Sequence, residues 1–110
     1  MSRVEITETG FETLVLLTRY MTEYIGERKA IDLADKLINT AEKSLLSNPK
    51  SAPVCHELEL IGVTNYRQLT FEKYKILYRY DELEKCAYLT AFMRHRQSAQ
   101  ALLVSYALIN

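Results

Sequence analysis

The chain has 110 residues, of which 48% are apolar and 25% charged, so it suits one folded domain over residues 1–110 and is not a disordered tail. Its formal net charge is zero, which argues against a protein that binds mainly through phosphate contacts. Residues 1–64 carry 7 basic and 10 acidic side chains, against 7 and 4 in residues 65–110. Only the second segment is therefore a candidate for contact with an anionic partner.

The sequence favours a cytoplasmic protein without a membrane segment. The first seven residues include two charges and no apolar core of a signal peptide, and no charge-free apolar run is long enough to cross a bilayer. Cys55 and Cys86 form no CxxC pair, which favours two reduced thiols. Together with His56 and His95 they match no familiar zinc spacing, so we expect no metal and no other cofactor.

The first half of the chain predicts a strand and two helices. Val4 and Ile6 alternate with polar residues, which predicts a short strand. Thr9 and Glu12 form the T-x-x-E pattern of a capping box, which predicts a helix over residues 10–25. Gly26 suits its C-terminal cap, and a second helix follows until the proline at position 49. Because the connector is so short, the two helices should form an antiparallel hairpin.

Apolar residues at helical spacing predict the buried side of each helix. In the first helix these residues are Phe11, Leu14, Leu17, Met21, Tyr24 and Ile25. In the second helix they are Ile31, Ala34, Leu37, Ile38, Ala41 and Leu45.

The second half predicts a three-stranded meander and a final helix. Residues 48–65 should be mostly loop. The hydrophobic period then changes to two, which predicts strands over residues 66–71, 74–80 and 86–94. Residues 97–109 have helical spacing. The order β-α-α-β-β-β-α predicts an α+β fold of two layers, in which the helix hairpin packs on a small, mostly antiparallel sheet.

Three short motifs in the predicted meander resemble a known family when they are taken in order. They are Tyr66-Arg67-Gln68-Leu69, then YKILYRYD over residues 74–81, then FMRHRQS over residues 92–98. Their order and spacing resemble the RelE/ParE toxin superfamily of bacterial type II toxin–antitoxin systems, which shows an R-x-L strand, a Y-[RK]-[IL]-x-Y-x-x-D strand and a basic last strand. The resemblance covers about residues 4–108 and implies a RelE/ParE-like fold.

The resemblance implies two possible activities. ParE-like toxins inhibit DNA gyrase by protein–protein binding and stabilise plasmids, whereas RelE-like toxins cut messenger RNA on the ribosome. Both kinds are neutralised by a small antitoxin whose C-terminal segment wraps the toxin. RelE-like members carry a tyrosine shortly after the basic last strand. Here residues 97–101 contain none, and Tyr106 lies on the apolar side of the final helix.

This departure from the RelE pattern, together with the zero net charge, favours the ParE-like branch. One alternative is a RelE-like, ribosome-dependent ribonuclease that uses Arg94 and His95. A second alternative is a non-toxic family member that only binds its antitoxin.

Two sets of residues are candidates for contact with partners. The residues expected to form an electropositive partner-binding surface are Arg67, Lys75, Arg79, Arg94 and Arg96. Residues 97–109 carry no charge, and a helix that is apolar on several sides is normally covered on several sides. The residues expected to contact the antitoxin or a second copy of the chain are Leu102, Leu103, Val104, Leu108 and Ile109.

Overall fold

The four strands form one mixed sheet in the order β1-β4-β3-β2 in the computed structural model, which describes residues 2–109. Strand β1 (Arg3–Ile6) runs parallel to β4 (Cys86–Arg94). Strand β3 (Tyr74–Asp81) lies antiparallel between β4 and β2 (Arg67–Phe71). The mostly antiparallel sheet and the α+β class are as the sequence predicts.

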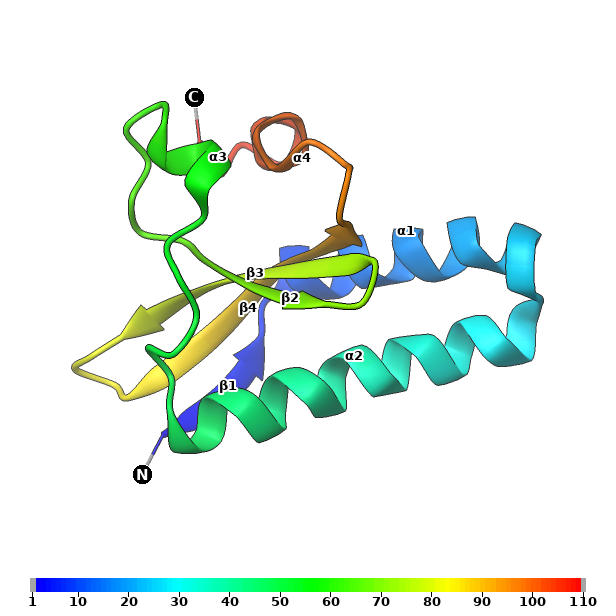
Figure 1. Cartoon of the computed structure of the whole chain (residues 1–110), viewed down its shortest axis with the longest axis horizontal. Helices are drawn as coiled ribbons and strands as arrows, with labels where there is room; N and C mark the ends of the chain where they lie inside the picture. The colour runs from blue at the N-terminus through cyan, green and yellow to red at the C-terminus, as the bar shows by residue number, and fades with distance from the viewer. Residues whose placement is uncertain (1, 110) are drawn as a thin grey trace.

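Two long helices form the predicted antiparallel hairpin, drawn in blue to green in Figure 1. They are α1 (Glu8–Ile25) and α2 (Glu27–Ser47), and Gly26 alone separates them. Gly26 has a φ of 85°, a left-handed conformation that favours glycine, and its N–H donates to the Thr22 carbonyl at 3.0 Å. This single residue therefore reverses the chain.

Helix α1 begins earlier than the capping-box pattern predicts. Its N-cap is Thr7, whose hydroxyl accepts a hydrogen bond from the Gly10 N–H at 3.0 Å, so the expectation of a cap at Thr9 is wrong. Thr7 lies directly after β1, and its own N–H donates to the Leu89 carbonyl at 3.1 Å. Because that bond holds Thr7 in an extended conformation beside β4, the helix starts there.

Helix α1 lies very close to β4 at a bulge. Leu77 pairs with Ala91 and Tyr78 with Leu89, so Thr90 is an extra residue on β4. A Cβ atom on Gly10 would come within 2.2 Å of the Leu89 carbonyl oxygen, so this approach requires glycine. The buried Thr13 hydroxyl accepts from the Phe92 N–H at 3.0 Å.

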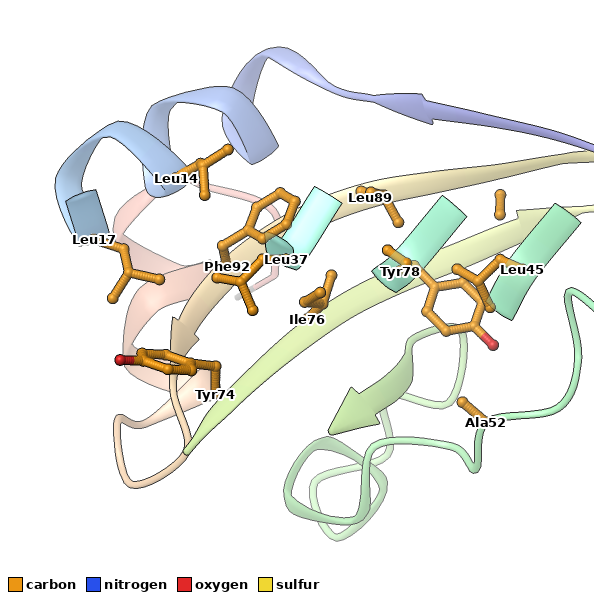
Figure 2. Packing of buried hydrophobic residues seen from close by; sticks show 12 residues of the cluster. Leu14, Leu17, Leu37, Leu45, Ala52, Tyr74, Ile76, Tyr78, Leu89 and Phe92 are labelled. Carbon is orange, nitrogen blue, oxygen red and sulfur yellow. The ribbon is translucent and has the colours of Figure 1, made fainter. Parts of the chain in front are cut away.

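Two apolar cores lie on opposite faces of the sheet. The first core, between the helix hairpin and the sheet, contains Leu14, Leu37, Ile76, Tyr78 and Phe92 (Figure 2). The second core lies under two short helices, α3 (His56–Glu59) and α4 (Ala99–Ser105). Its members are Cys55, Leu58, Tyr66, Leu77, Ala91, Met93, Ala99 and Leu103.

The short helices correct the sequence prediction in two places. Residues 56–59, expected as loop, form α3, and the final helix is shorter than the predicted range 97–109. Helix α4 ends because Ala107 adopts a φ of 57°, while the N–H groups of Leu108 and Ala107 donate to the carbonyls of Leu103 and Val104. This is a Schellman ending. Since helices cover both faces, the arrangement has more than the two expected layers (Figure 1).

The prediction of buried residues is right in the middle of the hairpin. It is wrong for Phe11 and for residues near the turn that joins the two helices. Leu14, Leu17, Leu37, Ala41 and Leu45 are buried as expected. The exposed exceptions are Phe11, Tyr24, Ile25 and Ile31. The last three lie near the turn of the hairpin, which projects beyond the end of the sheet (Figure 1).

Candidate functional site

The five basic residues predicted to form one electropositive surface lie in different places. Lys75 is only 5% exposed and faces the second core, and its Nζ lies 3.4 Å from Oε1 of Glu57 on α3. The expectation that Lys75 belongs to a partner-binding surface is therefore wrong. Alternation along β3 places it on the face opposite the helix hairpin, and α3 and α4 cover that face.

Glu57 connects both short helices to the sheet. Besides Lys75, its carboxylate accepts from the Gln100 N–H at 3.0 Å and from the Ser98 hydroxyl at 3.2 Å. Burial alone would raise the pKa of the Glu57 carboxyl. The N–H donors of Gln100 and Ala99 and the charge of Lys75 together hold this pKa below its ordinary value. We call this cluster, Glu57 with Lys75, Ser98 and Gln100, the Glu57 network.

Arg67 and Arg79 also have partners within the fold. The Arg67 guanidinium donates to the Ala52 carbonyl at 2.6 Å and to the Lys50 carbonyl at 3.3 Å, so it holds the loop after α2. The Arg79 guanidinium lies 4.5 Å from the centre of the Tyr88 ring. In the strand register, Arg67 lies opposite Tyr78 on the face of the sheet that the hairpin covers. Arg79 lies opposite Tyr88 on the other face.

Arg94 and Arg96 do lie together, in a groove at the end of the sheet beside α1. This groove, which we call the basic groove, has a volume of about 650 Å³. Its lining residues are Met21, Glu72, Lys73, Tyr74, Arg94, His95 and Arg96. The His95 N–H donates to the Lys73 carbonyl at 2.7 Å, which brings the β2–β3 turn next to the end of β4.

Lys73 is the groove cation that the sequence reasoning missed. The sequence indicates the position of Lys73 in part, because Tyr74 begins β3 and Arg94 ends β4. Their pairing, which places Lys73 beside His95, depends on the bulge at Thr90. A bulge shifts register by one residue, and nothing in the local pattern of β4 marks it.

A smaller cleft, of about 190 Å³, lies between α1 and the segment leading to α4. It shares Arg94 with the basic groove and is bordered by Leu16, which is 50% exposed, and Tyr20, which is 39% exposed. The Arg94 guanidinium lies 4.0 Å above the Tyr20 ring and donates to its hydroxyl at 3.1 Å. The Arg94 side chain, held by this contact, therefore separates the basic groove from the smaller cleft.

Two possible proton-transfer groups, the His95 imidazole and the Glu72 carboxylate, line the basic groove. Cleavage of RNA requires a base and an acid placed within hydrogen-bond reach of the reacting oxygens. The His95 imidazole is exposed and, within residues 2–109, makes no hydrogen bond to another side chain. Tyr106 caps the end of α4 rather than lining the groove.

The four residues considered for a metal site differ in exposure. Cys55 and Cys86 are buried free thiols, whereas His56 and His95 are exposed. Across residues 2–109, no cluster of three or more His, Cys, Asp or Glu side chains could hold a metal ion. Over the same residues, no helix combines the length and the apolar character needed to cross a membrane.

The final helix offers less free surface than the sequence suggests. Leu103 is fully buried in the second core, so it is not available to a partner and that part of the expectation is wrong. Leu102 and Ile109 pack partly against the same core. Val104 and Leu108 are exposed, and their contact with an antitoxin or a second copy stays a prediction.

Several solved structures share the fold. A chain of the chromosomal ParDE toxin–antitoxin system from P. aeruginosa matches with a TM-score of 0.68 at 18% identity, over 86% of this chain and 96% of that one. A chain of the RelBE2 toxin–antitoxin complex from Mycobacterium tuberculosis matches with a TM-score of 0.61 at 16% identity, over 87% and 93%. The isolated E. coli RelE toxin matches with a TM-score of 0.51 at 10% identity, over 99% and 100%.

At these identities the similarity establishes the fold, so the chain has the RelE/ParE fold. No protein-family model matches the sequence, and neither does any curated protein.

Proposed function

We propose that this protein is the toxin of a bacterial type II toxin–antitoxin pair, neutralised by a cognate antitoxin, and that it inhibits DNA gyrase by binding to it. The toxin part rests on the fold, which matches chains of the ParDE and RelBE2 systems over more than four fifths of this chain. Since one fold can carry several functions, the choice of target has to come from the site itself.

The observation that carries this choice is that three of the five predicted cations serve the fold. Lys75 pairs with Glu57, Arg67 holds the loop after α2, and Arg79 lies over Tyr88. A ribonuclease needs cations that converge on the scissile phosphate, where charge develops in the transition state. These three cations are engaged within the fold and lie on different faces of the sheet. Their arrangement therefore favours a protein that acts by binding another protein over a ribonuclease.

One observation favours the RelE-like alternative. His95 lies between Arg94 and Arg96 and beside Lys73 in the basic groove, which the Glu72 carboxylate also lines, so two possible proton-transfer groups lie among three cations. A ribosome-dependent ribonuclease would use this groove for the phosphate backbone of messenger RNA. The proposal and this alternative differ in which cellular process stops first.

Pulse labelling separates the two activities. The protein is induced in cells without antitoxin, and incorporation of thymidine and methionine is followed side by side. Inhibition of gyrase predicts that thymidine incorporation falls first while methionine incorporation continues. The control is Leu37→Asp, which buries a charge at a fully buried position and should not fold.

A fall of methionine incorporation before that of thymidine would contradict the gyrase proposal and support the ribonuclease. If neither falls, the protein is not an active toxin in that host, as the alternative of a non-toxic member that only binds its antitoxin predicts. Purified protein should inhibit supercoiling by gyrase in a concentration-dependent way.

A further inference from the structure

We propose that the basic groove binds an acidic segment of the target protein, and that an apolar side chain of this segment packs on Met21 inside the groove. The inference rests on the proposed function in one respect, namely that the protein acts by binding a protein. It adds the place of contact and the chemistry of the partner segment.

The charge of the groove is unbalanced. Lys73, Arg94 and Arg96 line it together with a single carboxylate, Glu72, which is 3.5 Å from Lys36 outside the groove. Between residues 2 and 109, none of the three groove cations forms an ion pair with a carboxylate. Three like charges in one groove repel each other, and carboxylates of a partner relieve that repulsion and orient the approach.

Part of the groove lining is apolar. It consists of Met21 of α1, which is partly exposed, and the mostly buried Tyr74 of β3, whose hydroxyl lies 3.8 Å from the Met21 sulfur. A methionine side chain adapts its shape to the group that packs on it. The groove volume of about 650 Å³ lies in the range of sites that hold a small ligand or a few side chains. An apolar patch beside three cations suits a leucine or phenylalanine flanked by carboxylates.

The apolar surface continues beyond the groove along α1. Leu16 and Tyr20 are exposed on one side of this helix and border the smaller cleft on the other side of Arg94. Tyrosine and arginine are common energetic anchors of protein interfaces. The contact between Arg94 and Tyr20 fixes both side chains before binding, which lowers the entropic cost of using them. An extended segment can therefore lie in the groove and pass over Arg94 towards Leu16.

Nucleic acid fits the groove less well than an acidic peptide. Binding of single-stranded nucleic acid relies on aromatic faces on which bases stack. Two aromatic rings line the groove: that of Tyr74, which is buried in the first core, and the exposed imidazole of His95. The Arg94 guanidinium lies over the Tyr20 ring nearby. The groove thus offers cations and apolar surface but a single exposed ring, which is a poor platform for successive bases.

The test reverses two exposed charges of the groove. The variant is Lys73→Glu with Arg96→Glu, and the matched control is Lys29→Glu with Lys43→Glu, two exposed lysines of α2 outside the groove. Both variants change the net charge equally. Supercoiling inhibition by purified protein, growth arrest on induction and the thermal unfolding midpoint are measured for each. We expect the groove variant to need about tenfold more protein for half-inhibition, because it places like charges against the partner. The control should remain within about twofold of the wild type.

The outcomes distinguish this inference from the proposed function. Equal inhibition of gyrase by the groove variant and the wild type would overturn the inference and leave the proposed function standing. If the wild type arrests growth without inhibiting gyrase, the target is wrong. Loss of arrest in the groove variant alone would then still support the groove. If the wild type neither inhibits gyrase nor arrests growth, both the inference and the proposed function are wrong.

RNA cleavage is the remaining outcome. If the wild type cuts messenger RNA and the groove variant does not, the groove is a nucleic-acid site and the inference fails.

A second variant keeps the test valid if the groove variant unfolds at a lower temperature than the control. In that case Arg96→Ala alone is used in its place. The same comparison is then expected with a smaller, several-fold loss of inhibition, because this change removes one attraction without adding a repulsion.

Discussion

The two faces of the sheet are covered in different ways. On one face, α1 and α2, with 18 and 21 residues, bury a continuous apolar layer (Figure 2). On the other face, α3 and α4 have only 4 and 7 residues. Helices this short are not stable by themselves. Their position depends on a small core and on the Glu57 network, so we expect stability to be broad on the first face and concentrated in a few polar contacts on the second.

The largest effect should come from the hairpin face. Leu37 is fully buried between α2 and the sheet (Figure 2), and Leu37→Ala should lower the free energy of unfolding by about 4 kcal/mol, because it leaves a cavity. Urea unfolding at neutral pH measures this loss. The exposed Leu46 of the same helix provides the control, and Leu46→Ala should cost less than about 1 kcal/mol. Similar losses at the two positions would contradict the packing of Leu37 between α2 and the sheet.

The close approach of α1 to β4 predicts the next largest effect. Gly10→Ala adds a Cβ atom whose ideal position lies 2.2 Å from the Leu89 carbonyl oxygen, so helix and strand have to move apart. We expect a loss of about 3 kcal/mol in the free energy of unfolding. Glu12→Ala, at an exposed position of the same helix, should change it by less than about 0.5 kcal/mol. A neutral Gly10→Ala would mean that α1 can lie further from the sheet at no cost.

Loss of a single carboxylate, that of Glu57, should lower the stability of the second face. Glu57→Gln removes the charge that pairs with the buried Lys75 and accepts from Ser98 and Gln100, and the loss should be about 2 kcal/mol. It should be local, so the amides of α4 should exchange hydrogen faster while those of α2 keep their protection. Glu59→Gln on the same short helix is the control, since within residues 2–109 the Glu59 carboxylate has no ion-pair partner other than His56.

The comparison of the two faces also explains what could be predicted from the sequence. Apolar periodicity marks α1, α2 and the strands, because burial on a large surface repeats along each element. The Glu57 network leaves no such pattern, since Glu57 and Lys75 lie 18 residues apart on different elements. The end of α4 was missed because an alanine, not a glycine, takes the left-handed position at Ala107. Of the candidate site, Arg94 and Arg96 were found from their local charge, whereas Lys73 required the register across the bulge.

The smallest expected effect is the pH dependence of the second face. The pKa of Glu57 in the folded protein lies below its ordinary value of 4.5. A depressed carboxyl pKa contributes stability that is fully present above the unfolded value and is lost as pH falls through the folded one. The difference in free energy of unfolding between wild type and Glu57→Gln should therefore be constant near neutral pH and should shrink below about pH 4.5.

Urea unfolding of both proteins at several pH values measures this difference, and hydrogen exchange of the α4 amides locates it. The difference between wild type and Glu59→Gln serves as the matched control on the same helix. Because Glu57 is partly exposed, solvent screens its interaction with Lys75, so the effect should stay well below that of Leu37→Ala. If the Glu57→Gln difference instead grew as the pH fell, the carboxyl would be stabilised in its neutral form. The negative charge of Glu57 would then oppose, rather than stabilise, the position of α3 and α4 on the second face.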